Sequence, residues 1–371
     1  MGCKFGMGDG LVLCLLVVAS MQQALVLPVV ARRRPPAMFV FGDSTLDVGN
    51  NNYLPGKDVA RANRSHYGID FPGGVPTGRF SNGHNTADYV AKGMGFVSSP
   101  PPYLSLAPSS GLLVLTALTT GVSYASGDAG ILDSTNPGKT ISLSRQVQYF
   151  KATKSKMAST LGSRAVNAML PRSIFLIGVG SNDMFVFSTT QPQSDVAAFY
   201  ASLLSNYSAT IEELHKLGAR KFAVVNVGMV GCVPRVRVLN ATGACAGGMN
   251  DLAAGFDAAL APLLAGLAAR LPGMAYSLAD SFGLTEDAFA DPAASGYTNV
   301  AGACCGGGRM GAEADCLPGS TLCADRGHYL FWDWVHPSQR AAMLTAKAFY
   351  DGPARFTTPI SFKQLAHKIR E

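Results

Sequence analysis

Short apolar runs alternate with longer amphipathic stretches along most of the chain. Several runs are apolar almost throughout, which is typical of parallel strands that helices cover on both faces. The two clearest helical patterns cover 199–217 and 249–271, and a helix-breaking Gly or Pro follows each of them. The predicted strands cover 37–41, 121–126, 173–180, 221–228 and 274–280.

This order of strands and helices predicts an α/β protein with three layers, α/β/α. Parallel strands need crossover connections, and right-handed crossovers place the helices on both faces of one sheet. We therefore expect a central parallel five-stranded sheet. Ligands bind beyond the carboxyl ends of the strands in such sheets, so polar residues that follow the predicted strands are candidates for a site.

The composition agrees with a single globular domain. Of the 371 residues, 48% are hydrophobic and 15% are charged, so the chain can bury a large core and is too apolar for disorder. No linker divides it. The net charge of +6 includes three arginines at 32–34, and the other basic residues are scattered without interleaved aromatic residues. This distribution argues against nucleic-acid binding.

The N-terminal segment has the pattern of a secretory signal peptide. It combines Lys4, an apolar block at 11–18 and small residues near position 20. We expect the signal peptide to cover 1–31, with cleavage between about 20 and 31, and no membrane insertion after its removal. A membrane anchor is the alternative, because the apolar stretch resumes after Gln22 and Gln23.

Removal of this segment leaves six cysteines, and an even number in a secreted chain favours disulfides over zinc. Cys232 and Cys245 bracket a short loop, so we expect them to pair and the last four to pair among themselves. Three glycosylation sequons agree with passage through a secretory lumen. The cysteines are Cys232, Cys245, Cys304, Cys305, Cys316 and Cys323, and the sequons start at Asn63, Asn206 and Asn240.

Three residues have the chemistry of a serine-dependent acyl transfer, which needs a nucleophile, a base and a carboxylate that holds the base. Ser44 directly follows the first predicted strand. In "FWDWVHPSQR", Asp333 precedes His336 by three residues, a spacing that lets one helical turn bring both side chains together. Asp280, at the end of another predicted strand, is the alternative carboxylate. No metal or cofactor is expected, since the other histidines lack metal-ligand spacing.

Two residues are candidates to stabilise an oxyanion. Asn182 follows the third predicted strand, and Gly127 follows the second, where the lack of a side chain lets a backbone N–H approach a ligand. Gly130 is an alternative to Gly127. Ser123 is an alternative nucleophile, because "GVSYA" approaches the G-x-S-x-G motif. It falls inside a predicted strand, however, and not at a strand-to-helix turn.

Four blocks in the chain occur in the order of the GDSL esterase/lipase family, part of the SGNH hydrolases, which the chain resembles. The blocks are FGDS with the following DVGNN, the glycine-containing ASGDAGIL, GSND and DWVH. The segments PTGRFSNG and FWDWVHPS are similar to the plant branch of that family. The resemblance covers about 37–350, which suggests one hydrolase domain over 37–355 and a C-terminal tail over 356–371.

The resemblance implies a flavodoxin-like fold with Ser44 as nucleophile, His336 as base and then acid, and Asp333 to orient it. The N–H of Ser44, the N–H of Gly127 and the side chain of Asn182 would form the oxyanion hole. A turn that presents Ser44 would be shaped by Asp47, Gly49 and Asn50. The family commonly has Asn where this chain has Ser123.

For function, the resemblance implies a secreted carboxylic-ester hydrolase that acts on a small-molecule, lipid or polymer ester. We expect a monomer in the cell wall or apoplast. An acyltransferase that uses the same acyl-enzyme is one alternative, because loops and not motifs decide whether water or an alcohol accepts the acyl group. A catalytically silent extracellular glycoprotein is the other.

Overall fold

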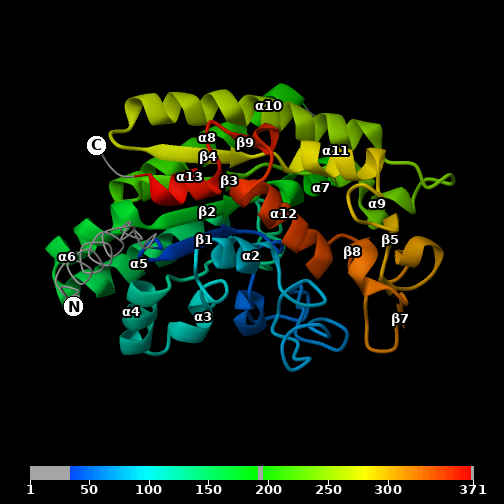
Figure 1. Ribbon diagram of the computed structural model, residues 1–371, viewed down its shortest axis with the longest axis horizontal. Helices are drawn as coiled ribbons and strands as arrows, with labels where there is room; N and C mark the ends of the chain where they lie inside the picture. Colours follow the sequence, from blue (N-terminus) through cyan, green and yellow to red (C-terminus); the bar gives the residue numbers. More distant parts are fainter. Residues whose placement is uncertain (1–33, 191–194, 369–371) are drawn as a thin grey trace, which may run out of the picture. The chain divides into compact units, whose positions relative to one another are not determined.

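The computed structural model describes residues 34–190 and 195–368, so the expected signal peptide lies outside the described residues. Four strands form parallel neighbours in chain order, and a short fifth strand pairs antiparallel with the last of them. The parallel strands all end at the same edge of the sheet (Figure 1). They are β1 (Met38–Gly42), β2 (Ile174–Gly178), β3 (Lys221–Val225) and β4 (Ala275–Ala279), and the fifth is β9 (Thr357–Thr358).

The sheet is therefore mainly and not wholly parallel, and 121–126 is not its fifth strand. This segment does run beside β1, where the N–H of Val40 donates to Val122 and that of Tyr124 donates to Val40. On its other side lie Pro101 and Pro102. Proline has no N–H to extend a ladder, so only isolated bridges form at Ser123.

Helices cover both faces of the sheet, because alternate residues of each buried strand point to opposite faces. Phe39 and Phe41 of β1 pack in one core with Phe150 of α5, whereas Met38 and Val40 pack in a second core. The helices of the first core, the sheet and the helices of the second core form three layers (Figure 1). The first core includes α5 (Leu143–Leu161), α8 (Val196–Lys216) and α10 (Gly247–Arg270), and the second includes α2 (Thr86–Gly93), α12 (Gln339–Asp351) and α13 (Phe362–His367).

Shorter elements connect these layers. The helices among them are α3 (Tyr103–Leu106), α4 (Ser110–Thr119), α6 (Ser163–Met169), α7 (Ser181–Thr190), α9 (Pro234–Arg237) and α11 (Ser281–Ala290). Two small sheets pair β5 (Asn299–Ala303) with β8 (Tyr329–Phe331), and β6 (Cys305–Gly306) with β7 (Thr321–Leu322).

The two helices predicted from the hydrophobic pattern correspond to α8 and α10. Among the described helices, α10 is also long and apolar enough to span a membrane by length and composition. Its residues Phe256, Leu260 and Leu264 belong to the main core and are at most 1% exposed. The apolar character of α10 therefore reflects its packing against the sheet and α8.

The C-terminal segment belongs to the fold. The expected tail at 356–371 contains β9, which pairs with β4, and α13, whose residues Phe362 and Leu365 are fully buried. Everything described from Arg34 onwards lies in one compact unit. The boundary expected at 355 is therefore too early.

The expected pairing of Cys232 with Cys245 is confirmed, and the last four cysteines pair as Cys304–Cys323 and Cys305–Cys316. The second and third bridges lie in one cluster with Trp332, the residue that precedes Asp333. They thus hold the long loop before β8 against the segment that carries the predicted base. The three sequon residues, Asn63, Asn206 and Asn240, are all exposed.

Candidate active site

The chain turns sharply between β1 and Ser44. Gly42 ends β1 with φ 154°, and a Cβ built there would lie 2.3 Å from the carbonyl oxygen of Gly178 in β2. A side chain at this position would push the two strands apart, so only glycine fits. The turn places Ser44, 8% exposed, at the carboxyl edge of the sheet.

A buried glutamine holds this strand end from the side. Gln146 of α5 accepts a hydrogen bond from the N–H of Gly42 at 2.8 Å and donates to its carbonyl oxygen at 2.8 Å. Its amide also donates to the carbonyl oxygen of Ile141 at 2.8 Å. Gln146 is fully buried, so no water can replace these bonds.

We expect the Gln146→Met variant to lose about 2–4 kcal/mol of unfolding free energy, because it leaves buried backbone groups of Gly42 without partners. Chemical denaturation of the purified variant measures this loss. Gln148→Met is the matched control, since Gln148 is exposed on the same helix. Equal stability of the two variants would contradict the bracing role of Gln146.

The polar turn after Ser44 is tied together by Asp47, which is fully buried. Its Oδ1 accepts the N–H groups of Gly49 and Asn50, each at 2.7 Å. Burial raises the pKa of Asp47 to about 6, although these backbone bonds oppose the rise. The amide of Asn50 then donates to the carbonyl oxygens of Ser123 and Ala125 at 2.9 and 2.8 Å. The turn is thus fastened to the segment beside β1.

His336 is held by a buried carboxylate. Its Nδ1 lies 2.9 and 2.8 Å from the two carboxylate oxygens of Asp333. A carboxylate can only accept, so Nδ1 carries a proton and Nε2 is left for other partners. Tyr67 donates its hydroxyl to Asp333 at 2.7 Å. Asp333 is fully buried, so these protein donors take the place of the hydrogen bonds that water would give an exposed carboxylate.

A turn, and not a helix, brings Asp333 and His336 together. Oδ1 of Asp333 accepts the N–H groups of Val335 at 2.9 Å and of His336 at 2.7 Å. The helix that follows, α12, starts at Gln339 with Ser338 as its N-cap. The expectation of one helical turn between the two residues is therefore wrong, although the spacing serves the same contact.

The attraction between Asp333 and His336 favours an ionised carboxylate and raises the basicity of the imidazole. Burial alone would raise the pKa of Asp333, but the charge and hydrogen bonds of His336 and the backbone donors hold it below its usual range. For His336, burial opposes the charged form, yet Asp333, with smaller contributions from Asp128 and Asp43, raises its pKa above the ordinary value. His336 is thus prepared to accept a proton.

We expect ester hydrolysis by this chain to decline on the acid side with a midpoint above about 6.5, the ordinary pKa of histidine. His336 acts as a base only when neutral, and its raised pKa keeps it protonated at higher pH than usual. A pH profile of kcat/KM on a neutral ester gives the midpoint. A midpoint below that of free histidine would contradict the environment of His336 described above.

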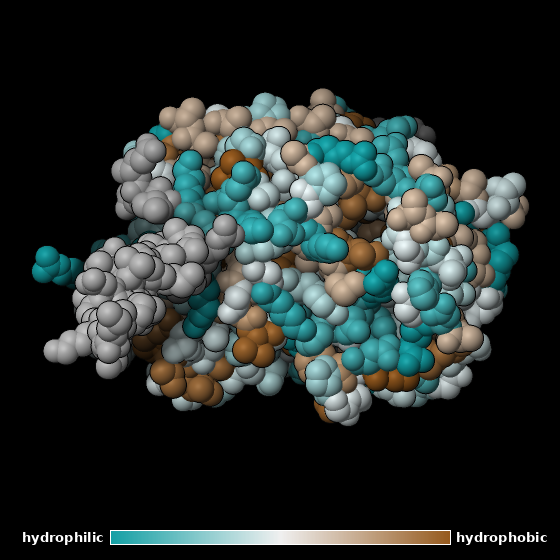
Figure 2. All heavy atoms as spheres, in the orientation of Figure 1, coloured by the Kyte–Doolittle hydropathy of each residue, from teal (hydrophilic) through white to brown (hydrophobic). Residues whose placement is uncertain are grey.

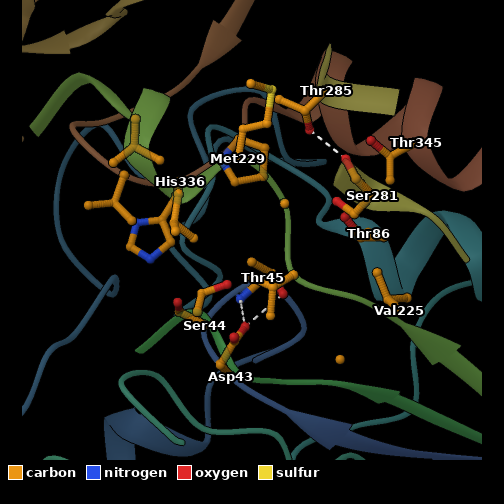
Figure 3. Close-up of a pocket in the computed structure, with 18 of the residues that line it drawn as sticks. Asp43, Ser44, Thr45, Thr86, Val225, Met229, Ser281, Thr285, His336 and Thr345 are labelled. Atoms are coloured by element: carbon orange, nitrogen blue, oxygen red, sulfur yellow. Dashed lines mark hydrogen bonds between the residues drawn. The ribbon is translucent and has the colours of Figure 1, made fainter. Parts of the chain in front are cut away.

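Ser44 and His336 line the same cavity, which has a volume of about 160 Å³. Figure 3 shows the imidazole of His336 pointing toward Ser44 across this space. No hydrogen bond joins the two side chains in the part of the chain that the structure describes, and such bonds often tighten only when substrate is bound. Figure 2 shows a hollow with apolar residues in its depth, where Figure 1 draws α11, α12 and β8.

Asn182 also lines this cavity, from the start of α7. One N–H of its side-chain amide donates to the carbonyl oxygen of Ala129 at 2.9 Å, and this bond fixes the orientation of the amide. The other N–H is available to a ligand, because a side-chain amide has two donors. The neighbouring Asp183 is buried and accepts N–H groups from Ile131 and Leu132, which holds the opposite loop in place.

Gly127 is differently placed from what the sequence suggested. Its N–H donates to Oδ2 of Asp47 at 3.0 Å, and it is not among the residues that line the cavity. A donor already bound to a buried carboxylate is not free for an oxyanion. In this geometry the N–H of Gly127 therefore offers no free donor for the oxyanion role that the sequence suggested. Gly130, the alternative, does not line the cavity either.

The other two alternatives also lie outside this arrangement. Ser123 is fully buried, and its hydroxyl has no access to the cavity. Asp280 caps α11 by accepting the N–H of Gly283 at 2.9 Å, and it accepts the amide of Asn226 at 3.1 Å. Asp333 is the carboxylate bound to His336. The described residues contain no group of three or more His, Cys, Asp or Glu side chains that could hold a metal ion.

Sequence reasoning missed several residues that position this site. Tyr67 and Gln146 contact Asp333 and Gly42 from segments far away in the chain. Phe80 places its ring 4.8 Å from that of His336. Phe80 belongs to PTGRFSNG, a segment whose only signal in the sequence is its similarity to the plant branch of the family. None of these side chains carries chemistry of its own, so spacing alone could not assign them.

A serine hydroxyl, an imidazole held by a buried carboxylate and an amide with one N–H left for a ligand, all at the edge of a parallel sheet, are features of serine-dependent hydrolases. The model of the family described as GDSL-like Lipase/Acylhydrolase matches residues 38–349 of this chain. The chain belongs to this family, whose members are in general ester hydrolases.

Similar proteins include several from Arabidopsis thaliana. GDSL esterase/lipase At5g55050 is 36% identical over 342 residues, which is 89% of each chain. GDSL esterase/lipase At1g29660 is 36% identical over 365 residues, which covers 95% of this chain and 97% of that one. A Parabacteroides merdae protein described as a GDSL-like lipase has a crystal structure that covers 85% of this chain and 94% of its own, with 13% identity and a TM-score of 0.35.

Proposed function

We propose that the protein is a secreted serine carboxylic-ester hydrolase in which Ser44, His336 and Asp333 form the catalytic triad. One observation carries the proposal. A buried carboxylate holds Nδ1 of His336, which leaves Nε2 on the side of the ring that faces Ser44 in a shared cavity. This arrangement lets a neutral imidazole take the proton of a serine hydroxyl.

In the first half of the reaction, Nε2 of His336 takes the proton of Ser44 while Oγ attacks the ester carbonyl. The resulting oxyanion would be stabilised by the side-chain amide of Asn182 and by the backbone N–H of Ser44. Within the described residues this N–H has no other acceptor. The intermediate then collapses to an acyl-enzyme, and His336 returns the proton to the departing alcohol.

In the second half, His336 takes a proton from water as the water oxygen attacks the acyl carbon. The bond between this carbon and Oγ of Ser44 then breaks, His336 returns the proton to Oγ, and the acid is released. The same oxyanion donors serve both halves. Asp333 stays ionised and stabilises the imidazolium in each step, in accord with its lowered pKa. The reaction needs neither a metal nor a cofactor.

The cellular location is part of the proposal. Three disulfides among the described residues are typical of oxidising compartments. The exposed sequons at Asn63, Asn206 and Asn240 and the signal-like N-terminus agree with secretion. We expect the mature chain to act as a monomer in the cell wall or apoplast, on a lipid or other ester.

The test is covalent labelling with a fluorophosphonate probe. The mature chain is expressed under oxidising conditions and treated with the probe, and the modified peptide is mapped by mass spectrometry. We expect the label on the peptide that contains Ser44. A folded protein without label, or with label on another serine, would overturn the proposed triad.

A further inference from the structure

The cavity beside Ser44 has a polar far end. Thr86, Ser281 and Thr345 place hydroxyl groups there, on the side opposite to His336 (Figure 3). The three residues come from three different elements, α2, α11 and α12. Thr285 lies next to them, and its hydroxyl donates to the carbonyl oxygen of Ser281 at 2.7 Å. Several hydroxyls from separate elements therefore converge on one end of the cavity.

Three of these hydroxyls have no partner. No hydrogen bond forms at the side-chain oxygens of Thr86, Ser281 and Thr345 in the described part of the chain. Thr86 is only 6% exposed, so bulk water reaches it only through the cavity. Because these oxygens face the cavity and have no partner within the described residues, a ligand that supplies a hydrogen-bonding group can take the place of water at this point.

The surrounding structure holds these hydroxyls in place before a ligand arrives. Asn226, which follows β3, accepts the N–H of Ser281 and donates to Asp280, the N-cap of α11. Thr86 is the first residue of α2, which begins with a capping box formed by Asn85 and Asp88. Groups fixed in this way lose little entropy on binding, which favours affinity and specificity.

The charged and the apolar residues that line the cavity limit which kind of ligand fits it. The only charged or titratable side chains among the described residues that line the cavity are Asp43 and His336, both at the Ser44 end. The far end therefore suits a neutral group that both donates and accepts, as a hydroxyl does. Leu46, Val225 and Val227 also line the cavity. These apolar side chains suit a hydrocarbon segment of the ligand.

We propose that the substrate is an aliphatic ester with a hydroxyl group on the part that extends from the ester carbon toward α11 and α12, where Thr86, Ser281 and Thr345 bind it. This inference rests on the proposed ester hydrolysis and names its substrate class. Ser44 follows β1 and Ser281 follows β4, three strand spacings away. Adjacent strands lie about 4.8 Å apart, so several carbon atoms separate the hydroxyl from the ester.

The experiment compares matched pairs of esters. Methyl octanoate and methyl ω-hydroxyoctanoate differ by a hydroxyl on the acyl side, and octyl acetate and ω-hydroxyoctyl acetate differ by one on the alcohol side. Further pairs with shorter and longer carbon chains vary the distance between the ester group and the hydroxyl. We expect the hydroxylated member of one pair to have a kcat/KM at least about fivefold higher, since one or two hydrogen bonds are gained. The pair that responds identifies the side of the ester that enters the polar end.

Variants connect this preference to the three hydroxyls. We expect Thr345→Val, Thr86→Val and Ser281→Ala each to reduce the ratio of hydroxylated to plain substrate by about twofold to tenfold. Thr160→Val is the matched control, because Thr160 is exposed on α5 and lies outside the cavity. It should leave the ratio unchanged. A ratio near one in both wild-type pairs at every chain length would overturn the inference.

Binding to the Ser44→Ala variant separates this inference from the proposed hydrolysis. Calorimetry with octanoate, ω-hydroxyoctanoate, octanol and octanediol needs no turnover. We expect tighter binding of the hydroxylated member of the pair that responds in kinetics. Equal affinities would overturn the inference even if Ser44 is labelled by the probe. If the hydroxylated member binds more tightly but the probe labels no serine of the wild-type chain, the polar binding site is supported and only the proposed hydrolysis is overturned.

Discussion

We expect the Ser44→Ala variant to lose ester hydrolysis by about a thousandfold to a millionfold in kcat. Without the hydroxyl no acyl-enzyme forms, and the imidazole and the oxyanion donors can only assist direct attack by water. Ser44 is 8% exposed and makes no side-chain hydrogen bond within the described residues. The substitution should therefore leave the fold intact, and the loss is attributable to chemistry.

Initial rates on a chromogenic short-chain ester measure this effect. Ser123→Ala is the matched control, because Ser123 is the other serine that the sequence suggested as nucleophile. Its hydroxyl is buried without a partner, so its removal should leave kcat within a few-fold. If Ser123→Ala abolished activity while Ser44→Ala did not, the nucleophile would be misassigned.

The sequence predicted those parts of the site that lie next to a regular element. Ser44 and Asn182 directly follow buried apolar runs, and parallel strands bring the ends of such runs to one edge. Asp333 and His336 are close enough in the chain for a local turn to join them. In each case a local pattern determines the position, so one sequence suffices.

The other parts of the site, and the fifth strand of the sheet, depend on contacts between residues far apart in the chain. The spacing of residues in the sequence does not reveal such contacts. Gly127 looked free because it follows an apolar run, but its N–H is bound by Asp47, 80 residues earlier. Gln146 and Tyr67 lie in segments without chemical motifs, and their roles follow only from what they touch. The fifth strand was misplaced for a similar reason. The hydrophobic pattern of 121–126 is that of a strand, yet its outer neighbour is rich in proline.

The same contacts hold the turn that carries Ser44, the proposed nucleophile. β1 reaches Ser44 through Gly42, which touches β2 on one side and is bonded to Gln146 on the other. The turn after Ser44 is bound through Asp47 to the segment at 123–127. The proposed nucleophile thus lies between two segments that are each held by hydrogen bonds, so we expect it to be in place before substrate binds.

We expect the Asp333→Asn variant to retain the fold and lose about ten-thousandfold in kcat. The asparagine oxygen can still accept the N–H groups of Val335 and His336, which bind Oδ1 now. Its NH₂ group, however, would face Nδ1 of His336 and favour the tautomer with the proton on Nε2. In that tautomer the nitrogen that faces Ser44 cannot accept a proton.

Kinetics and a pH profile together test this expectation. Removal of the carboxylate charge lowers the pKa of His336, so the acid limb of the residual activity should move to lower pH. Asp325→Asn is the matched control, because Asp325 pairs with His328 at the same spacing, at 2.8 Å, on the surface. This control should keep full activity. If Asp333→Asn kept activity within tenfold and Asp280→Asn did not, the charge that orients His336 would come from Asp280, and the turn between Asp333 and His336 would serve only the fold.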